Sequence, residues 1–475
     1  MTPTRIGRRS ALALVCGALC LMQAPAAARR KQAEPLPPPT SGLVDNVNGL
    51  AVGSDGHLAR FTGLLIDAQG RVERHLAAGD SRPGRLAWRL DGQGRTLIPS
   101  FVHAHARVID SGIAQMTLDL SASRSLAEAQ AAISAWMRDN PGRRWILGRG
   151  WDAARWAGES GTPARLPSAR DLDVATGDTP AWLRSADGRL GWANSAALRL
   201  SGLKAGPAEG AFGGSERDRI ERTVPVPAAK DRDIALDKAQ RRLVSQGISA
   251  VADMGTTIED WQAYRRAGDR GALRLRIVGY AAGIDQMTVI AGPEPSPWLY
   301  GDRLRLIGVL LPVPAPDDKA AMDGTRLRNQ ASRAAMDGFQ IAFAVDNAPA
   351  ENEANAAIAE LSETYKGDRR WRIEMGTQTT GLPSALSAEE SPFALVARIA
   401  AADGGGITRA LGALTSKSAH AMFAEAQVGA LEPGQWADFL IVDRDISTAA
   451  ADQIAGTQIL EHWIGGRRTW STEGK

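Results

Sequence analysis

Short apolar runs alternate with longer alanine-rich stretches over most of the chain. From residue 97 onward, eight runs of three to eight residues have the apolar character of buried strands, and the stretches between them have the composition of helices. This alternation favours an α/β fold, a (β/α)8 TIM-like barrel, over a β-sandwich. The predicted strands cover residues 97–102, 145–147, 180–183, 248–252, 273–278, 304–311, 339–345 and 371–375.

The two ends of this region have a different pattern. Residues 43–97 contain short apolar stretches divided by Asp-Gly, Gln-Gly and Pro-Gly turns, which indicates a small antiparallel sheet. Residues 425–475 return to such strands, including the apolar run that precedes Asp443. We expect both ends to form one composite β-sandwich domain, with the barrel over residues 98–424.

The first 28 residues resemble a signal peptide. Arg5, Arg8 and Arg9 form a basic front, an apolar run follows over residues 11–22, and three alanines at 26–28 offer a cleavage site. The apolar run is shorter than the roughly 20 residues that span a bilayer, and no other stretch is long and apolar enough. The sequence therefore predicts a cleaved signal peptide, a flexible proline-rich leader over residues 29–42 and a periplasmic or secreted protein without a membrane span. The Arg8-Arg9 pair leaves a twin-arginine export route open.

Cysteine content and charge exclude several kinds of site. Cys16 and Cys20 both lie within the predicted signal peptide, so the mature chain has no disulfide and no thiolate nucleophile. The chain has 56 basic and 53 acidic residues, and cleavage after Ala28 would remove three arginines from the basic front. Since no basic excess remains, nucleic-acid binding is not indicated.

Four segments resemble motifs of the amidohydrolase superfamily. Residues 97–107, Leu-Ile-Pro-Ser-Phe-Val-His-Ala-His-Ala-Arg, are similar to its first barrel strand, Pro-Gly-Phe-Val-Asp-x-His-x-His. Residues 188–198 are similar to a motif of the N-substituted formamide deformylase-like branch, residues 247–255 match another motif, and residues 429–443 resemble the closing segment. The resemblance runs from about residue 43 to the end of the chain.

The resemblance implies hydrolysis of carbon–nitrogen bonds other than peptide bonds. In this family, zinc or another divalent metal is held by histidines, a carboxylated lysine and an aspartate, and it activates a water molecule. One first-strand histidine is retained as His105, whereas arginine is a permanent cation that cannot bind a metal. The implied ligand positions that are substituted are Arg107, Leu310, Ala344, Met375 and Ala385. We therefore expect a pseudoenzyme without a cofactor that serves as a binding scaffold for a small molecule.

His103 and His105 leave a second interpretation open. They stand two residues apart on one face of a strand. They either bind a metal weakly, with Asp346 or Glu374 as a third ligand, or form hydrogen bonds with neighbouring residues. In the first case, the chain is an active, zinc-dependent or other metal-dependent amidohydrolase that acts on a small amide-like substrate through a rebuilt site, which would also include Arg107. Asp253 matches a family position, but an aspartate at a strand end also caps the helix that follows it, and without a metal we expect Asp253 to have this capping role.

Other candidate ligand-binding residues lie in loops that resemble the substrate side of the family. Trp151, Trp156 and Trp192 either form an apolar wall for a ligand or pack in a core. Arg189 stands where the resemblance implies a histidine after Asp-Gly. Analogy with the family also suggests a homodimer.

Overall fold

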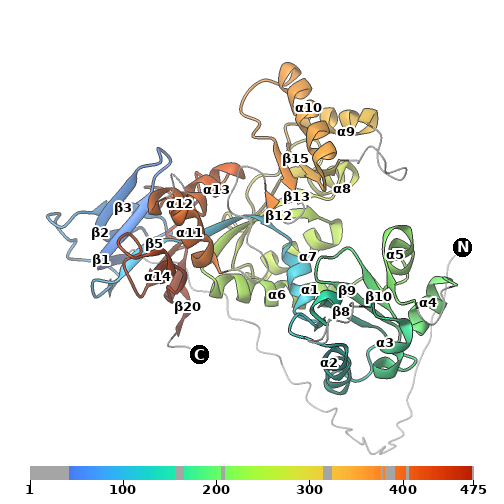
Figure 1. Cartoon of the computed structure of the whole chain (residues 1–475). Helices are drawn as coiled ribbons and strands as arrows, with labels where there is room; N and C mark the ends of the chain where they lie inside the picture. Colours follow the sequence, from blue (N-terminus) through green and yellow to red (C-terminus); the bar gives the residue numbers. More distant parts are fainter. Residues whose placement is uncertain are drawn as a thin grey trace, which may run out of the picture. The chain divides into compact units, whose positions relative to one another are not determined.

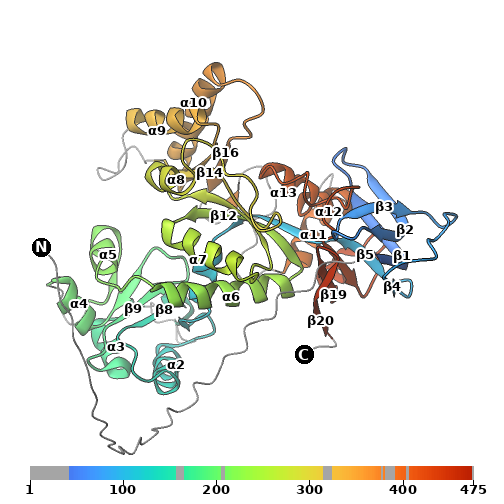
Figure 2. The ribbon, with the colours of Figure 1, turned by 180° about the vertical axis from the view of Figure 1, so that it is seen from behind.

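The computed structural model describes residues 42–156, 165–204, 209–313, 324–375, 378–379, 391–402 and 406–472. The predicted signal peptide and all but the last residue of the predicted leader lie outside these residues, as does Ala385. Strands of the described part form three sheets, which Figures 1 and 2 show from opposite sides. Within the same part of the chain, no helix has the length and apolar character needed to cross a membrane.

The first sheet has eight strands taken from both ends of the chain. Its order is β20-β19-β18-β5-β1-β2-β3, and β4 also pairs with β1. Antiparallel pairing of β18 with β5, which places Phe439 opposite Pro99, joins the two chain ends in one sheet, as the sequence suggested. The exact domain boundaries remain a prediction. The strands are β1 (Gly42–Val52), β2 (Leu58–Ile66), β3 (Val72–Leu76), β4 (Trp88–Asp91), β5 (Thr96–Pro99), β18 (Phe439–Val442), β19 (Ile459–Ile464) and β20 (Arg467–Ser471).

The central sheet has seven strands in the order β17-β16-β15-β14-β13-β12-β6. All neighbouring pairs from β6 to β16 are parallel, and only β17 is antiparallel to its neighbour. Because parallel strands begin at the same edge, their carboxyl ends also meet at one edge, where such sheets usually carry their sites. The strands are β6 (Phe101–Ala106), β12 (Ile248–Thr256), β13 (Arg276–Ala281), β14 (Leu304–Pro312), β15 (Gln340–Val345), β16 (Arg372–Met375) and β17 (Gln378–Thr379).

Two of the eight predicted barrel strands belong to a separate third sheet. The runs at 145–147 and 180–183 form parts of β8 and β9, and the order of this sheet is β11-β10-β9-β8-β7. The assignment of these two runs to the barrel was therefore wrong, because a short apolar run does not specify which sheet it joins. The strands are β7 (Leu118–Asp119), β8 (Ile146–Trp151), β9 (Ala181–Ser185), β10 (Gly191–Ala193) and β11 (Ala211–Phe212).

Helices connect the parallel strands, as expected for an α/β fold. Helix α6 packs on β12 and on α7, and Figure 2 shows these elements side by side. The helices are α1 (Val108–Ala114), α2 (Leu126–Asp139), α3 (Ala169–Thr176), α4 (Ser195–Ser201), α5 (Gly214–Glu221), α6 (Ala229–Ser245), α7 (Ile258–Asp269), α8 (Ile284–Ala291), α9 (Gly324–Met336), α10 (Ala348–Thr364), α11 (Pro392–Ala401), α12 (Ile407–Ala413), α13 (Ser416–Ala421) and α14 (Ala451–Ala455), with a 3-10 turn at Ala153–Trp156.

A buried ion pair joins the first sheet to the central sheet. Arg276 of β13 donates from Nε and Nη2 to the two carboxylate oxygens of Asp438, each at 3.0 Å, and both side chains are at most 2% exposed. The same carboxylate accepts a hydrogen bond from Gly465 N at 2.7 Å. Because both charges are paired and hydrogen-bonded, the junction tolerates their burial.

Candidate functional site

Three basic side chains occupy alternate positions at the end of β6. His103 and His105 lie in the strand, and Arg107 follows it directly as the residue that precedes α1. Alternate residues of a strand share a face. Exposure rises along this face, because His103 is 9% exposed whereas the side chains of His105 and Arg107 are 23% and 57% exposed. The face therefore leads from the interior to solvent at the carboxyl end of the sheet.

His105 is hydrogen-bonded to a buried carboxylate. Its Nδ1 lies 2.6 Å from Glu374 Oε2, and the Glu374 side chain is 2% exposed. The other carboxylate oxygen of Glu374 lies 2.5 Å from Arg372 Nη2, which also donates to the carbonyl oxygen of Ala104 at 2.8 Å. Side-chain contacts thus connect β16 with β6, and Arg372 offsets the charge of Glu374.

His103 is a buried imidazole without a hydrogen-bond partner in the described structure. Both ring nitrogens are enclosed, and neither has a donor or acceptor within reach. Burial lowers the pKa of His103 to about 3, and the nearby His105 contributes to the shift. The ring is therefore neutral at physiological pH, with one nitrogen able to donate and the other able to accept.

Arg107 and Leu310 approach the same point at the carboxyl end of β12. The Arg107 guanidinium donates from Nε to the carbonyl oxygen of Met254 at 3.2 Å, and its Nη1 lies 3.3 Å from Asp110. Gly255 has a φ of +87°, and an ideal Cβ placed on it would lie 2.9 Å from Arg107 Nη2 and 3.6 Å from Leu310 Cδ2. Glycine permits both this backbone conformation and the close approach of the guanidinium.

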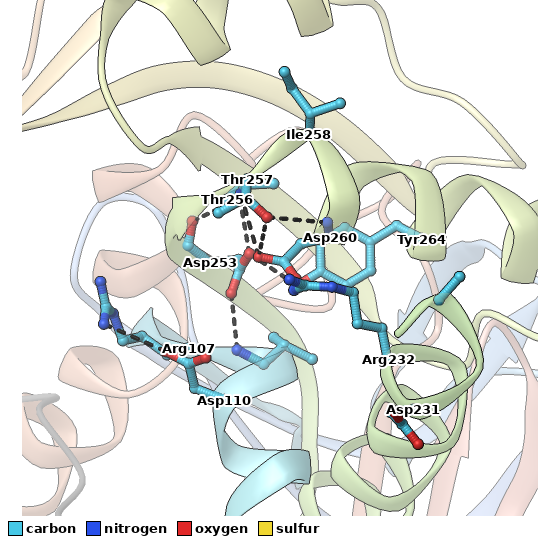
Figure 3. Close-up of polar contacts among 12 residues, drawn as sticks. Arg107, Asp110, Asp231, Arg232, Asp253, Thr256, Thr257, Ile258, Asp260 and Tyr264 are labelled. Carbon is cyan, nitrogen blue, oxygen red and sulfur yellow. Dashed lines mark hydrogen bonds and ion pairs between the residues drawn. The ribbon is translucent and has the colours of Figure 1, made fainter. Parts of the chain in front are cut away.

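Asp253 of β12 organises the beginning of α1. Its carboxylate has three donors: Oδ1 accepts from Val108 N at 2.8 Å, and Oδ2 accepts from the hydroxyls of Thr256 at 2.7 Å and Tyr264 at 2.8 Å. Figure 3 shows Thr256 and Tyr264 beside Asp253. Burial raises the pKa of the Asp253 carboxyl to about 6, although these three hydrogen bonds oppose the shift.

The helix that Asp253 caps is not the one that follows it in the chain. Val108 is the first residue of α1, whereas α7 begins with its own capping box, in which Thr257 and Asp260 exchange hydrogen bonds (Figure 3). Asp260 also pairs with the buried Arg232 of α6. The polar contacts of Asp253 therefore fix α1, and with it Arg107, relative to β12.

The other implied ligand positions carry none of the side chains that commonly bind zinc. Leu310 of β14 and Ala344 of β15 are half-buried, and Met375 ends β16. Among the residues that the structure describes, no three histidine, cysteine, aspartate or glutamate side chains form a group able to hold a metal ion. The predicted third ligands differ, since Asp346 is exposed in the bend after β15 whereas Glu374 contacts His105.

The three candidate tryptophans pack against one another around the third sheet. Their ring centroids are 5.8–6.2 Å apart. Trp192 is fully buried, and its Nε1 donates to Ser168 O at 2.8 Å, so its ring cannot form the surface of an open wall in this structure. Trp151 is 1% exposed but borders a cavity of about 270 Å³. Arg189 is exposed in the turn between β9 and β10.

Arg372 and Tyr264 contact residues of the site but were not predicted from the sequence. Arg372 stands two residues before Glu374, so strand periodicity places both on one face, and this pattern was a usable signal. Tyr264 lies in the second turn of α7. Its contact with Asp253 depends on how α7 packs. No local pattern in the sequence reveals that contact.

Comparisons with known proteins agree on the family and the fold. The Amidohydrolase family profile matches residues 90–405 and 404–470. The protein LONG AFTER FAR-RED 3 of Arabidopsis thaliana is 24% identical over 390 residues, which are 71% of this chain and 65% of the plant protein. The N-substituted formamide deformylase of Arthrobacter pascens is 27% identical over 205 residues, 39% of this chain and 37% of the deformylase. The chain thus spans less than two thirds of the length of either relative.

A solved structure has the same fold over most of the chain. An uncharacterised metal-dependent hydrolase from Pyrococcus horikoshii superposes with a TM-score of 0.66 at 17% identity, covering 87% of this chain and 99% of that one. At this identity, the likeness concerns the fold, a TIM-like barrel with an additional domain. Because the family profile covers most of the sequence, the chain belongs to the amidohydrolase family.

Proposed function

We propose that this amidohydrolase has lost metal-dependent hydrolysis and binds a small molecule at the carboxyl end of the central sheet. The observation that carries the proposal is the meeting of Arg107 and Leu310 around Gly255. The resemblance implies a histidine and a carboxylated lysine at these two positions, and the structure has a cation and an alkyl group there.

The chemistry of these side chains opposes a divalent metal. A guanidinium has no lone pair to donate and repels a cation, and leucine and alanine have no donor atoms. The retained His105 is held by Glu374, an arrangement that also orients metal-binding histidines in other proteins. One oriented imidazole is too few for a tight site, because zinc sites in proteins usually have three or four protein ligands.

A second candidate function is metal-independent hydrolysis of a small amide-like substrate. The observation that favours it is the 2.6 Å contact between His105 Nδ1 and Glu374 Oε2. A carboxylate that accepts the Nδ1 proton fixes the tautomer in which Nε2 can act as a general base. Of the other rebuilt-site candidates, Arg107 lies on the same face as His105, whereas Asp346 is exposed at the end of β15.

A turnover assay tests the proposal against both kinds of enzyme. The mature protein and its His105→Ala variant are incubated with a panel of N-substituted formamides, with zinc or with a chelator, and amine release is measured. We expect the two proteins to release amine at the same background rate. Turnover that requires zinc and disappears in the variant would establish a metal enzyme, and turnover that survives the chelator and disappears in the variant would establish the second candidate.

A further inference from the structure

We propose that the small molecule is an amphipathic carboxylate, whose anionic group binds Arg107 and whose apolar part lies against Leu310 and Ala344. This inference rests on the proposed binding function of the same site and specifies its ligand. It follows from the charges and the apolar side chains that stand together at the carboxyl end of the central sheet.

The Arg107 guanidinium is held in place by a hydrogen bond, but its positive charge is only weakly neutralised by a neighbouring carboxylate. Its Nε donates a hydrogen bond to Met254 O, which fixes the orientation of the planar guanidinium. The carboxylate that pairs with it, Asp110, is 3.3 Å away, and the two side chains are 57% and 68% exposed. An ion pair this exposed contributes little, so a ligand carboxylate can replace Asp110 at small cost. The planar guanidinium of arginine can donate two parallel hydrogen bonds to the two oxygens of a carboxylate.

Nearby acidic groups do not cancel this positive charge. Glu374 is ion-paired with Arg372 and hydrogen-bonded to His105. The Asp253 carboxylate accepts hydrogen bonds from Val108 N and two hydroxyls. Asp346 is exposed at the end of β15. Asp110, which is itself exposed, is the acidic group that contacts Arg107.

Two apolar side chains lie at the same edge of the sheet as the cation. Leu310 and Ala344 are partly exposed rather than enclosed in the core, and Leu310 Cδ2 lies near the same point above Gly255 as Arg107 Nη2. Deeper along β6, both ring nitrogens of His103 are buried without a hydrogen-bond partner in the described structure, so they can form hydrogen bonds with a ligand. A cation at the rim with apolar surface beside it matches a ligand that has one anionic end.

Three probes of equal chain length test the inference on the unchanged protein. Hexanoate, hexylammonium and hexanol are titrated into the mature protein by isothermal titration calorimetry. We expect saturable binding of one hexanoate per chain, with hexanol at least ~10-fold weaker and hexylammonium weaker still, because a charge-assisted hydrogen bond at a partly exposed site accounts for about a factor of 10 in affinity. Equal affinity for hexanoate and hexanol, or tighter binding of hexylammonium, would overturn the inference.

Variants then assign the anionic group to its partner. Arg107→Gln should weaken hexanoate on the order of 10-fold and leave hexanol unchanged. The matched control is Arg85→Gln, which removes an exposed arginine from the loop between β3 and β4 and should change neither affinity. Circular dichroism and the urea midpoint establish that each variant is folded. An Arg107→Gln protein that is folded and binds hexanoate as tightly as before would contradict the assignment.

Metal analysis separates this inference from the proposed function. If the purified protein holds one divalent metal per chain, the proposed function fails whatever the probes do. If the protein is metal-free but prefers hexanol or hexylammonium, only the carboxylate inference fails.

Discussion

Arg107 and Leu310 converge above Gly255, with Arg107 Nη2 at 2.9 Å and Leu310 Cδ2 at 3.6 Å from the position a Cβ would take there. Arg107 directly follows β6 and Leu310 lies in β14, and these two strands are separated by β12 and β13 in the sheet order. Side chains from distant strands therefore still meet at one edge, as the fold requires. In this chain they bring together a cation and an apolar group, which favours a ligand with an anionic and an apolar part.

Gly255→Ala should disturb this convergence. An alanine would strain the backbone at a φ of +87° and force Arg107 Nη2 to move. We expect a loss of about 1–2 kcal/mol in the free energy of unfolding from the backbone alone, together with weaker hexanoate binding. The control is Gly56→Ala, whose φ is +81° and whose Cβ would meet nothing within 4 Å. Gly56→Ala should lower stability without changing hexanoate affinity, and a parallel loss of affinity in both variants would count against the role given to Gly255.

Glu374→Gln should destabilise the protein strongly. The substitution removes the negative charge beside Arg372, whose side chain is 7% exposed, and leaves the guanidinium uncompensated. Loss of one partner from such a buried pair costs about 3–5 kcal/mol, measurable by urea unfolding at neutral pH. Asp237→Asn breaks an exposed pair with Arg241, whose side chains are 49% and 64% exposed, and should cost less than about 1 kcal/mol. Similar losses in the two variants would show that Glu374 is not held as a buried charge.

Asp253 should make stability decrease as the pH rises. Its folded-state pKa is raised to about 6 from 3.8, so the folded protein binds the proton more tightly than the unfolded chain. This stabilising contribution is complete below about pH 3.8 and is lost as the pH rises to 6, an effect of about 3 kcal/mol. Urea unfolding from pH 4 to pH 7 should show the stability of Asp253→Asn increasing relative to wild type. A difference that stays constant over that range would contradict the raised pKa.

His103 should have the opposite pH dependence. Its folded-state pKa is lowered to about 3 from 6.5, so protonation favours the unfolded chain as the pH falls below 6.5. At pH 5 this amounts to about 2 kcal/mol. His103→Leu removes the titrating group and two buried nitrogens without partners, so its advantage over wild type should grow between pH 7 and pH 5. The comparison uses the same urea unfolding experiment. If the stability advantage of His103→Leu decreases as the pH falls, the lowered pKa of His103 is contradicted.

The sequence predicted the α/β class and the family more reliably than the placement of single elements. Five of the eight predicted strands lie in the central sheet, because apolar runs with helical spacers are typical of parallel strands. A sixth, predicted over residues 97–102, is divided between β5 of the first sheet and β6 of the central sheet. The runs at 145–147 and 180–183 carry the same local signal but pair elsewhere, since partner choice depends on contacts distant in sequence. The assignment of Leu310 and Ala344 to substituted ligand positions rests on motif spacing and stays a prediction, whereas the position of Arg107 over Gly255 required the structure.

The measurement that tests the central claim most directly is the metal content of the purified protein. The protein is expressed with zinc, manganese and iron supplied, dialysed, and analysed by inductively coupled plasma mass spectrometry beside its His105→Ala variant. We predict a folded protein with far less than one metal ion per chain and no difference between the two proteins. Near-stoichiometric metal in the wild type that is lost in His105→Ala would contradict the account and identify a rebuilt metal-dependent hydrolase.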